Sequence, residues 1–72
     1  MTDTAALNEI IERSGYKKSY ISKMIGLSAY GLAKKINNVT EFKTGEIKRL
    51  CELLKIDSLE ERDRIFFAKK VD

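Results

Sequence analysis

The sequence predicts an all-α fold, a single small domain of about five short helices. The chain has 72 residues, which is enough for one hydrophobic core. Its apolar residues recur at the three- and four-residue spacing of helix faces, without strand-like alternation. It contains no proline, and 43% of its residues are hydrophobic against 35% charged, which is typical of a chain that folds. We therefore expect one domain over residues 1–72.

The first predicted helix covers about residues 4–14. Apolar side chains at helical spacing mark its buried face, namely Leu7, Ile10 and Ile11. Asp3 or Thr4 is suited to cap the first turn, because a side-chain oxygen there can accept from a free backbone N–H. Gly15 can adopt the left-handed conformation that ends a helix. Local signals thus bound this helix at both ends.

Two shorter helices are predicted over about residues 18–25 and 28–36. Their inward-facing side chains are expected to be Ile21, Ile25, Leu32 and Ile36. Gly26 supplies a residue that can turn left-handed after the first of them. Ser28 is the expected N-cap of the second.

The last two helices are predicted over about residues 44–55 and 58–68. Phe42, in the loop before them, is expected to plug the core. Ser58 and Glu61 have the spacing of a capping box, which satisfies free N–H groups at a helix start. The predicted core of the domain is Leu7, Ile10, Ile21, Ile25, Leu32, Ile36, Ile47, Leu50, Cys51 and Leu54.

The titratable residues favour a binding role over catalysis. There is no histidine and only one cysteine, Cys51, so neither a Cys/His nucleophile pair nor a zinc site of ordinary composition can be built. The acidic residues lie mostly on faces predicted to be solvated. We therefore expect no enzyme activity, no cofactor and no metal, and we interpret Cys51 as a small buried hydrophobe with a slowly reacting thiol.

Charge and compartment are only loosely constrained. Lys and Arg outnumber Asp and Glu by 14 to 11, giving a net charge of +3, which permits contact with nucleic acid without requiring it. A single cysteine cannot form an intrachain disulfide and fits a reducing cytoplasm. No apolar run approaches the roughly 20 residues that span a bilayer, and the first residues lack the pattern of a signal peptide. We expect a soluble, cytoplasmic protein.

The segment SYISKMIGLSAYGLAKKINN, residues 19–38, carries the most specific pattern. Ile21, Ile25 and Leu32 are spaced to lock two helices at a steep angle, Gly26 can make the tight turn between them, and Leu27 can pack beneath it. This spacing resembles the helix-turn-helix of the Cro/CI, or lambda-repressor-like, family, and the likeness extends over about residues 5–67. Two positions depart from the family pattern: Ser22 stands where alanine is common, and Ile36 rather than Lys35 supplies the last core contact.

The resemblance implies which residues meet DNA, namely Lys18, Ser28, Ala29, Tyr30, Lys34 and Asn37. Lys18 would contact a phosphate, and Asn37 would touch the DNA backbone. Lys17 and Lys35 could also contact phosphates, and the alternative for both is that they lie on a solvated face. Only Tyr30, against a thymine methyl group, and Lys34, against a guanine, have the means to read base edges. Such a reader would be weak and poorly specific.

The same two helices also suggest a protein-binding surface, made up of Tyr20, Met24, Ala29, Tyr30 and Ala33. Tyr20 and Met24 lie one helical turn apart, and Tyr30 points away from the predicted core. Apolar side chains exposed where a DNA reader would be polar are typical of a protein partner. The alternative is that Tyr20 and Met24 merely edge the core.

Three consecutive apolar residues, Ile65, Phe66 and Phe67, stand near the end of the last predicted helix. Because successive side chains on a helix are about 100° apart, all three cannot face one core. At least one should be exposed in a monomer. We interpret the three as a candidate oligomerisation surface, and a homodimer as one expected state; the alternative is a loosely packed tail.

In length and organisation the chain resembles the small early regulators of temperate-phage genetic switches, which include Cro proteins and modulator-of-repression antirepressors. The weak base-reading chemistry favours the second kind. The resemblance then implies an antirepressor that holds the DNA-binding face of a cognate CI-like repressor in the bacterial host cytoplasm, with operator double-stranded DNA as a further partner of the complex. The alternative is a Cro-like homodimeric operator-binding repressor, and a weaker third interpretation is an antitoxin-like module.

Overall fold

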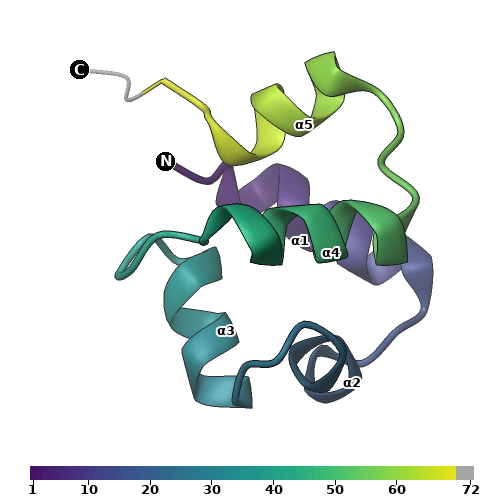
Figure 1. Ribbon diagram of the computed structural model, residues 1–72, viewed down its shortest axis with the longest axis vertical. Coiled ribbons are helices and arrows are strands. Elements are labelled where there is room, and N and C mark those ends of the chain that lie inside the picture. Colours follow the sequence, from purple (N-terminus) through teal and green to yellow (C-terminus); the bar gives the residue numbers. More distant parts are fainter. Residues whose placement is uncertain (70–72) are drawn as a thin grey trace.

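The computed structural model describes residues 1–69, which form five α-helices (Figure 1). In chain order they are α1 (Thr4–Ser14), α2 (Lys18–Met24), α3 (Ala29–Ile36), α4 (Thr44–Leu54) and α5 (Leu59–Phe66). α1 and α4 cross the middle of the molecule, with α5 on one side and α2 and α3 on the other (Figure 1). The predicted all-helical fold class is confirmed. None of the helices in this range has the length and apolar character needed to cross a membrane.

Local capping groups set the helix starts. The Asp3 carboxylate accepts a hydrogen bond from the Ala6 backbone N–H at 3.0 Å, so Asp3 rather than Thr4 is the N-cap of α1. The Ser28 hydroxyl accepts from the Gly31 N–H at 3.0 Å and caps α3 as predicted. Gly15 follows α1 with a φ of 77°, the left-handed conformation expected of a C-terminal glycine.

The C-terminal helix is shorter than predicted. α5 begins after Ser58, whose hydroxyl accepts from the Glu61 N–H at 3.2 Å, and it ends at Phe66 rather than near residue 68. Beyond the helix, the Ala68 N–H donates to the Met1 carbonyl oxygen at 2.9 Å. The chain after the helix therefore bonds to the N-terminal segment instead of extending the helix.

The buried core draws on all five helices and the loop before α5. Its members are Leu7, Ile11, Ile21, Ile25, Leu32, Ile36, Ile47, Leu50, Ile56, Ile65 and Phe66. Seven of the ten predicted core residues are among them. Ile10, Cys51 and Leu54 are instead only partly buried at its edge, so their assignment is corrected.

The shift from Ile10 to Ile11 has a geometric reason. Leu7 and Ile11 are four residues apart and share one stripe of α1, and this stripe faces the other helices. Phe42 plugs the core as predicted, because its ring meets that of Phe66 edge-on, with 5.6 Å between the centroids.

The N-terminal segment ties together parts of the chain that are distant in sequence. The side-chain amide of Asn38 donates to the Thr2 carbonyl oxygen and accepts from the Thr2 N–H, both at 2.8 Å. The Asp3 N–H donates to the Ile65 carbonyl oxygen at 2.6 Å. One extended segment thus bonds both to the α3–α4 loop and to α5.

Candidate interaction surface

The α2–α3 pair is held together by its apolar side chains and by the turn between the helices. Ile21 and Ile25 from α2 and its cap, and Leu32 from α3, are all buried. Gly26 has a φ of 80°, which few residues other than glycine adopt easily, and the next N–H, that of Leu27, donates to the Ser22 carbonyl oxygen at 2.8 Å. The turn is therefore fixed by both conformation and hydrogen bonding.

Ser22, which departs from the family pattern, occupies a tightly packed position. It is buried, and its hydroxyl donates to the Ser19 carbonyl oxygen at 2.8 Å. This bond satisfies the buried hydroxyl within α2 itself. A serine is accommodated there without an unpaired polar group.

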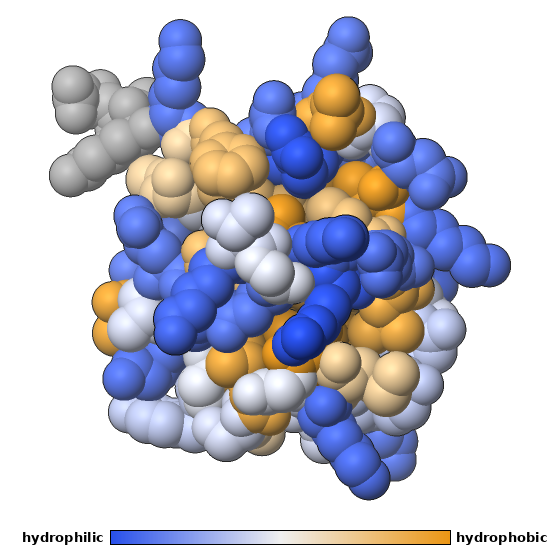
Figure 2. Space-filling model, viewed as in Figure 1, coloured by the Kyte–Doolittle hydropathy of each residue, from blue (hydrophilic) through white to orange (hydrophobic). Residues whose placement is uncertain are grey.

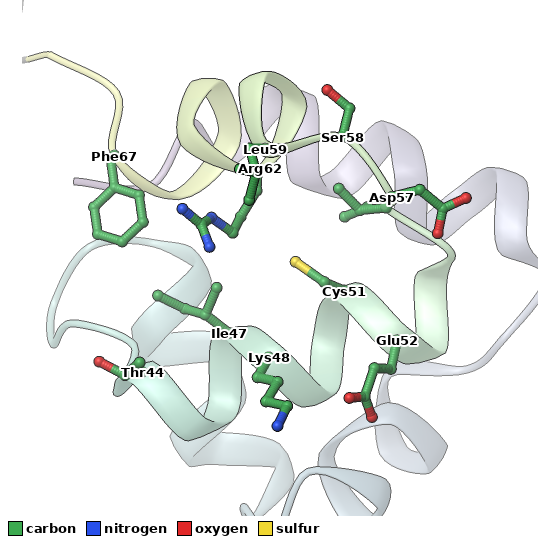
Figure 3. A pocket seen from close by; sticks show the side chains of 11 residues that line it. Thr44, Ile47, Lys48, Cys51, Glu52, Asp57, Ser58, Leu59, Arg62 and Phe67 are labelled. Carbon is green, nitrogen blue, oxygen red and sulfur yellow. The ribbon is translucent and has the colours of Figure 1, made fainter.

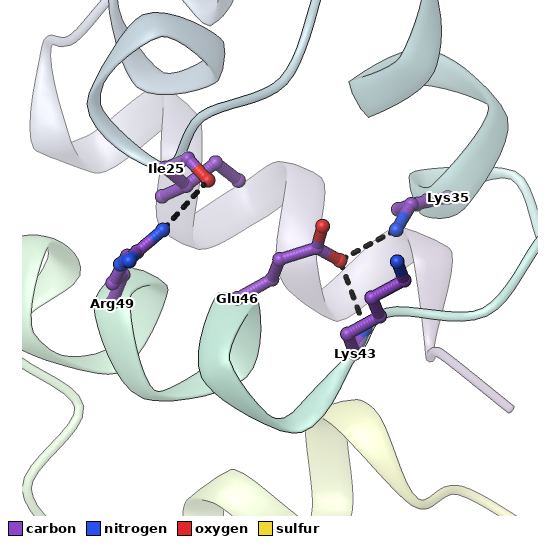
Figure 4. Close-up of polar contacts among 5 residues, drawn as sticks. All are labelled: Ile25, Lys35, Lys43, Glu46 and Arg49. Atoms are coloured by element: carbon purple, nitrogen blue, oxygen red, sulfur yellow. Dashed lines mark hydrogen bonds and ion pairs between the residues drawn. The ribbon is translucent and has the colours of Figure 1, made fainter.

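A side chain of α4 holds the turn between α2 and α3 in place. Figure 4 shows the Arg49 side chain reaching from α4 to the carbonyl oxygen of Ile25, with 3.4 Å between Nη1 and the oxygen. The guanidinium thereby binds a carbonyl that has no partner in α2 beyond the helix end. This contact holds the end of α2 on α4 and helps to fix the direction of its outward face.

That outward face carries large apolar side chains. Tyr20 is 44% exposed, Met24 51% and Tyr30 75%. Tyr20 and Met24 lie one turn apart on α2, and Tyr30 lies in the first turn of α3. The sequence prediction that these side chains are exposed is confirmed. About half of the Tyr20 and Met24 side chains is in solvent, which fits both a protein-binding surface and the alternative, a place at the edge of the core.

Tyr16 extends this surface and was not predicted. Its ring lies 5.2 Å from that of Tyr20, in a tilted arrangement, and it too is exposed. The signal was present in the sequence as a four-residue spacing. It was missed because Tyr16 precedes the helix, where that spacing need not bring side chains together.

The residues that were assigned to DNA have local partners. The Ser28 hydroxyl is engaged in capping α3, and the Asn37 side-chain amide donates to the Ala33 carbonyl oxygen at 2.9 Å. The Lys34 ammonium lies over the Tyr30 ring, 5.4 Å from its centroid. Lys18 is exposed in the first turn of α2. Contact with DNA would compete with the arrangements of Ser28, Asn37 and Lys34.

Small residues separate the large ones on α3. Ala29 and Ala33 are exposed, so the backbone of α3 is accessible there to a close neighbour. We call the exposed side chains of α2, α3 and the residues just before them the α2–α3 surface, defined as Tyr16, Tyr20, Met24, Ala29, Tyr30 and Ala33. This surface combines large side chains, which offer apolar area to bury, with the small residues Ala29 and Ala33, where a partner chain can approach closely.

The surroundings of this surface are basic. From Tyr16 to Asn38 the chain has five lysines and no acidic residue. One of them, Lys35, is neutralised: its ammonium lies 2.5 Å from a Glu46 carboxylate oxygen, and both side chains are only 12% exposed (Figure 4). Four lysines therefore give the α2–α3 region a positive field.

The predicted oligomerisation residues separate into two groups. Ile65 and Phe66 lie in the core and present no side chain to a partner, so both are removed from that surface. Phe67 follows the end of α5 and is 57% exposed. The expectation that at least one of the three is exposed is confirmed, and only Phe67 meets it.

Cys51 is not fully buried, which corrects its interpretation as a core residue. Its side chain points from α4 into a hollow between α4 and α5 (Figure 3). Partial burial raises the pKa of the thiol, against the opposing effect of Arg62. A slow reaction at neutral pH is still expected, now because little thiolate is present.

No protein-family model, curated protein or solved structure matched this chain when it was compared with them. Among residues 1–69, no group of three or more His, Cys, Asp and Glu side chains is placed to hold a metal ion.

Proposed function

We propose that this chain is an antirepressor of a temperate-phage genetic switch. It docks with the α2–α3 surface on the DNA-binding face of a cognate CI-like repressor in the host cytoplasm and so keeps that repressor from its operator. The observation that supports this most is the exposure of Tyr20, Met24 and Tyr30 on the two helices that, in a helix-turn-helix, would face DNA, the first across the backbone and the second in the major groove.

The chemistry of the surface suits a protein better than a base edge. Readout of bases depends on side chains such as Arg, Asn and Gln that present paired donors and acceptors. Ala29 and Ala33 have none, and the Lys34 ammonium already lies over the Tyr30 ring. A specific operator contact would therefore rest on very few groups.

A protein interface, by contrast, uses what the surface offers. Tyr30 and Met24 supply apolar area for burial, and the tyrosine hydroxyl can remain at the wet rim. Ala29 and Ala33 let a partner helix approach closely. Because interface energy is concentrated in a few anchors, Tyr30→Ala or Met24→Ala should each weaken partner binding by roughly 1–3 kcal/mol.

Electrostatics provides a way to separate the two kinds of partner. The α2–α3 region carries four unneutralised lysines, and the DNA-binding face of a repressor is itself basic. Added salt screens repulsion between like-charged faces, so repressor binding should hold or tighten as salt rises. Binding to DNA should instead weaken steeply, because contacts with phosphates release counterions.

The second candidate function is a Cro-like homodimeric repressor that binds operator DNA. The run of five lysines without an acidic residue from Tyr16 to Asn38 favours it. In that case the protein alone should bind a specific duplex tightly, with a steep loss at high salt, and Lys34→Ala should weaken specific binding more than non-specific binding.

The decisive experiment mixes the protein with labelled operator DNA, with and without the neighbouring CI-like repressor. We expect the protein to release the repressor from the operator while binding DNA alone only weakly and without sequence preference. Tight, specific binding of the operator by the protein alone, with the repressor complex left intact, would establish the Cro-like function instead.

The docking site is tested by calorimetry at low and high salt on Met24→Asp and Tyr30→Asp. At high salt each should lower repressor affinity by more than the alanine substitutions do, because a charge would have to be buried while its attraction to the basic repressor face is screened. Val39→Asp is the matched control, since Val39 is also exposed but lies in the loop between α3 and α4, outside the α2–α3 surface. If both charged variants keep native helicity and bind like the wild type, the α2–α3 surface is not the docking site.

A further inference from the structure

A groove lies between α4 and α5, away from the α2–α3 surface. It has a volume of about 630 Å³ (Figure 3). Its apolar lining consists of Ile47, Cys51, Ile56, Leu59 and Phe67, and its charged lining of Lys48, Glu52, Asp57 and Arg62. On this face of the molecule, apolar surface shows between hydrophilic side chains over α4 and α5 (Figure 2).

Two of the large exposed apolar side chains of the protein border this groove. Leu59 is 67% exposed at the start of α5, and Phe67 is 57% exposed just beyond its end. They stand at the two ends of one helix. The same face therefore has a groove and two projecting apolar side chains, Leu59 and Phe67, which could enter a groove of the same shape on another molecule.

The charges of the groove complement each other. Glu52 and Asp57 lie toward one end, and Lys48 and Arg62 lie nearer the Phe67 end (Figure 3). The two acidic and two basic groups sum to zero, whereas the whole chain carries +3. Arg62 already has partners: its Nη2 lies 3.0 Å from an Asp63 carboxylate oxygen, and its guanidinium carbon lies 6.0 Å from the centroid of the Phe67 ring. Lys48 is therefore the better placed of the two to pair with another copy.

We propose that this groove is the interface of a two-fold symmetric homodimer. In such a dimer the same patch meets itself, so residue i of one copy faces residue j of the other, and the reverse pair forms as well. A second copy laid antiparallel along α4 brings its acidic end to the basic end of the first. Lys48 of each copy then faces Glu52 of the other, while Leu59 and Phe67 are covered.

The dimer leaves the α2–α3 surface free. α2 and α3 lie on the opposite side of α1 and α4 from α5 (Figure 1). The pair would thus present two docking surfaces at once. This inference goes beyond the proposed function and does not depend on which partner the α2–α3 surface binds.

Sedimentation equilibrium over a wide range of protein concentration tests the proposal. We expect a reversible monomer–dimer equilibrium in the wild type. Phe67→Asp and Leu59→Asp should each raise the dissociation constant by roughly tenfold or more, because each would place a charge in the covered interface. Tyr30→Asp, at an exposed aromatic residue of α3, is the control and should leave it unchanged.

A charge reversal tests the antiparallel pairing itself and involves only exposed residues of α4. Lys48→Glu and Glu52→Lys should each weaken the homodimer, because like charges then face each other twice. Mixing the two variants should restore association, since one copy then carries acidic groups at both positions and the other carries lysines at both, and both facing pairs join opposite charges.

A wild type that stays monomeric at the highest concentration would overturn the proposal and leave the groove to another molecule. So would a dimer that dissociates in Tyr30→Asp but not in Phe67→Asp or Leu59→Asp, because its interface would lie elsewhere. Failure of the mixed charge variants to associate better than either alone would exclude the antiparallel pairing. Circular dichroism on each variant confirms that its helices are intact.

Discussion

Asn38 has a left-handed backbone conformation, with a φ of 63°, and its side-chain amide forms two hydrogen bonds with the backbone of Thr2. Asparagine tolerates this conformation better than most residues because its short polar side chain can bond locally. Here the conformation also aims the amide at the N-terminal segment. One residue thus ends the turn after α3 and holds the start of the chain.

Substituting Asn38 should separate these two contributions. Asn38→Gly keeps the backbone conformation but loses the two hydrogen bonds to Thr2 and a longer one, 3.4 Å, to the Thr4 hydroxyl, and should lower the free energy of unfolding by about 1–2 kcal/mol. Asn38→Ala also places an alanine in a strained left-handed conformation, so its free energy of unfolding should be lower by about a further 1 kcal/mol. Urea unfolding of both variants measures the difference.

Asn37, the preceding residue and also exposed, is the matched control for this pair of substitutions. Its side chain bonds only to Ala33 within the same turn, so Asn37→Ala should have a smaller effect than Asn38→Ala. If Asn38→Gly is as stable as the wild type, the bonds to Thr2 contribute nothing measurable. If the alanine and glycine variants are equally stable, the backbone conformation is not strained.

Between elements, the contact of Lys35 on α3 with Glu46 on α4 stands out because it is shielded from solvent (Figure 4). The Glu46 carboxylate also accepts from the Lys43 backbone N–H at 2.9 Å, which caps the start of α4. Burial opposes ionisation of Glu46, but the hydrogen bonds from Lys35 and Lys43 and the positive charges of both lysines together outweigh it and lower the pKa of Glu46. One carboxylate thus joins two helices and satisfies a helix start.

This lowered pKa predicts a pH dependence of stability. A carboxyl group with a lower pKa in the folded state binds its proton more readily in the unfolded state, so it stabilises the fold fully above its ordinary pKa of 4.5. That contribution should disappear as the pH falls through the lower, folded-state pKa. Glu46→Gln should lower the free energy of unfolding at neutral pH by about 2 kcal/mol and flatten its fall in acid.

The measurement is urea unfolding of the wild type and Glu46→Gln from neutral to acidic pH. Glu9→Gln is the control, because Glu9 also pairs with a basic residue, Arg13, but both side chains are largely exposed. Its curve should follow that of the wild type closely. Equal stability of wild type and Glu46→Gln at neutral pH would show that the shielded pair adds no net stability.

For the molecule as a whole, the end of α5 marks the boundary between buried core residues and exposed ones. Ile65 is fully buried, whereas Phe67, two residues later, is mostly in solvent. Ile65→Ala should lower the free energy of unfolding by about 3 kcal/mol, because it leaves a cavity among packed side chains. Phe67→Ala should change it by less than about 0.5 kcal/mol in dilute solution.

Thermal and urea unfolding at low protein concentration compare the two variants, and dilution keeps any self-association from contributing. Should Ile65→Ala unfold like Phe67→Ala, α5 would not belong to the cooperative core. The fold would then depend on the other four helices alone.

Helix positions and ends were largely predictable because their signals are local. Asp3, Gly15 and Ser28 act within one turn of chain, and the structure uses each of them as the sequence predicts. The capping-box signal at Ser58 and Glu61 likewise marks the true start of α5. By contrast, the chain after α5 bonds through Ala68 to Met1, and no pattern near residue 66 could indicate a partner at the other end of the chain.

The candidate surface divides in the same way. Tyr20, Met24 and Tyr30 are exposed because they lie off the apolar stripes of α2 and α3, and helical periodicity is a property of the sequence. Their place on an outer face therefore follows from residue spacing alone. The contact of Lys34 with Tyr30 also follows from spacing, because the two are four residues apart within α3. The contact of Tyr16 with Tyr20 does not, because Tyr16 precedes α2 and its side-chain direction is not set by helical spacing.

The sequence by itself determined the five helices, most of their ends and the apolar stripes, because each depends on residues within a few turns of one another. Only the tertiary structure decided that Ile65 and Phe66 are core and Phe67 is not, that Cys51 lines a groove, and that Lys35 is neutralised by Glu46. Those outcomes depend on the angles at which helices far apart in the chain pack against each other. A side chain is buried only when a second element covers it, and the sequence of one helix does not specify where that second element lies.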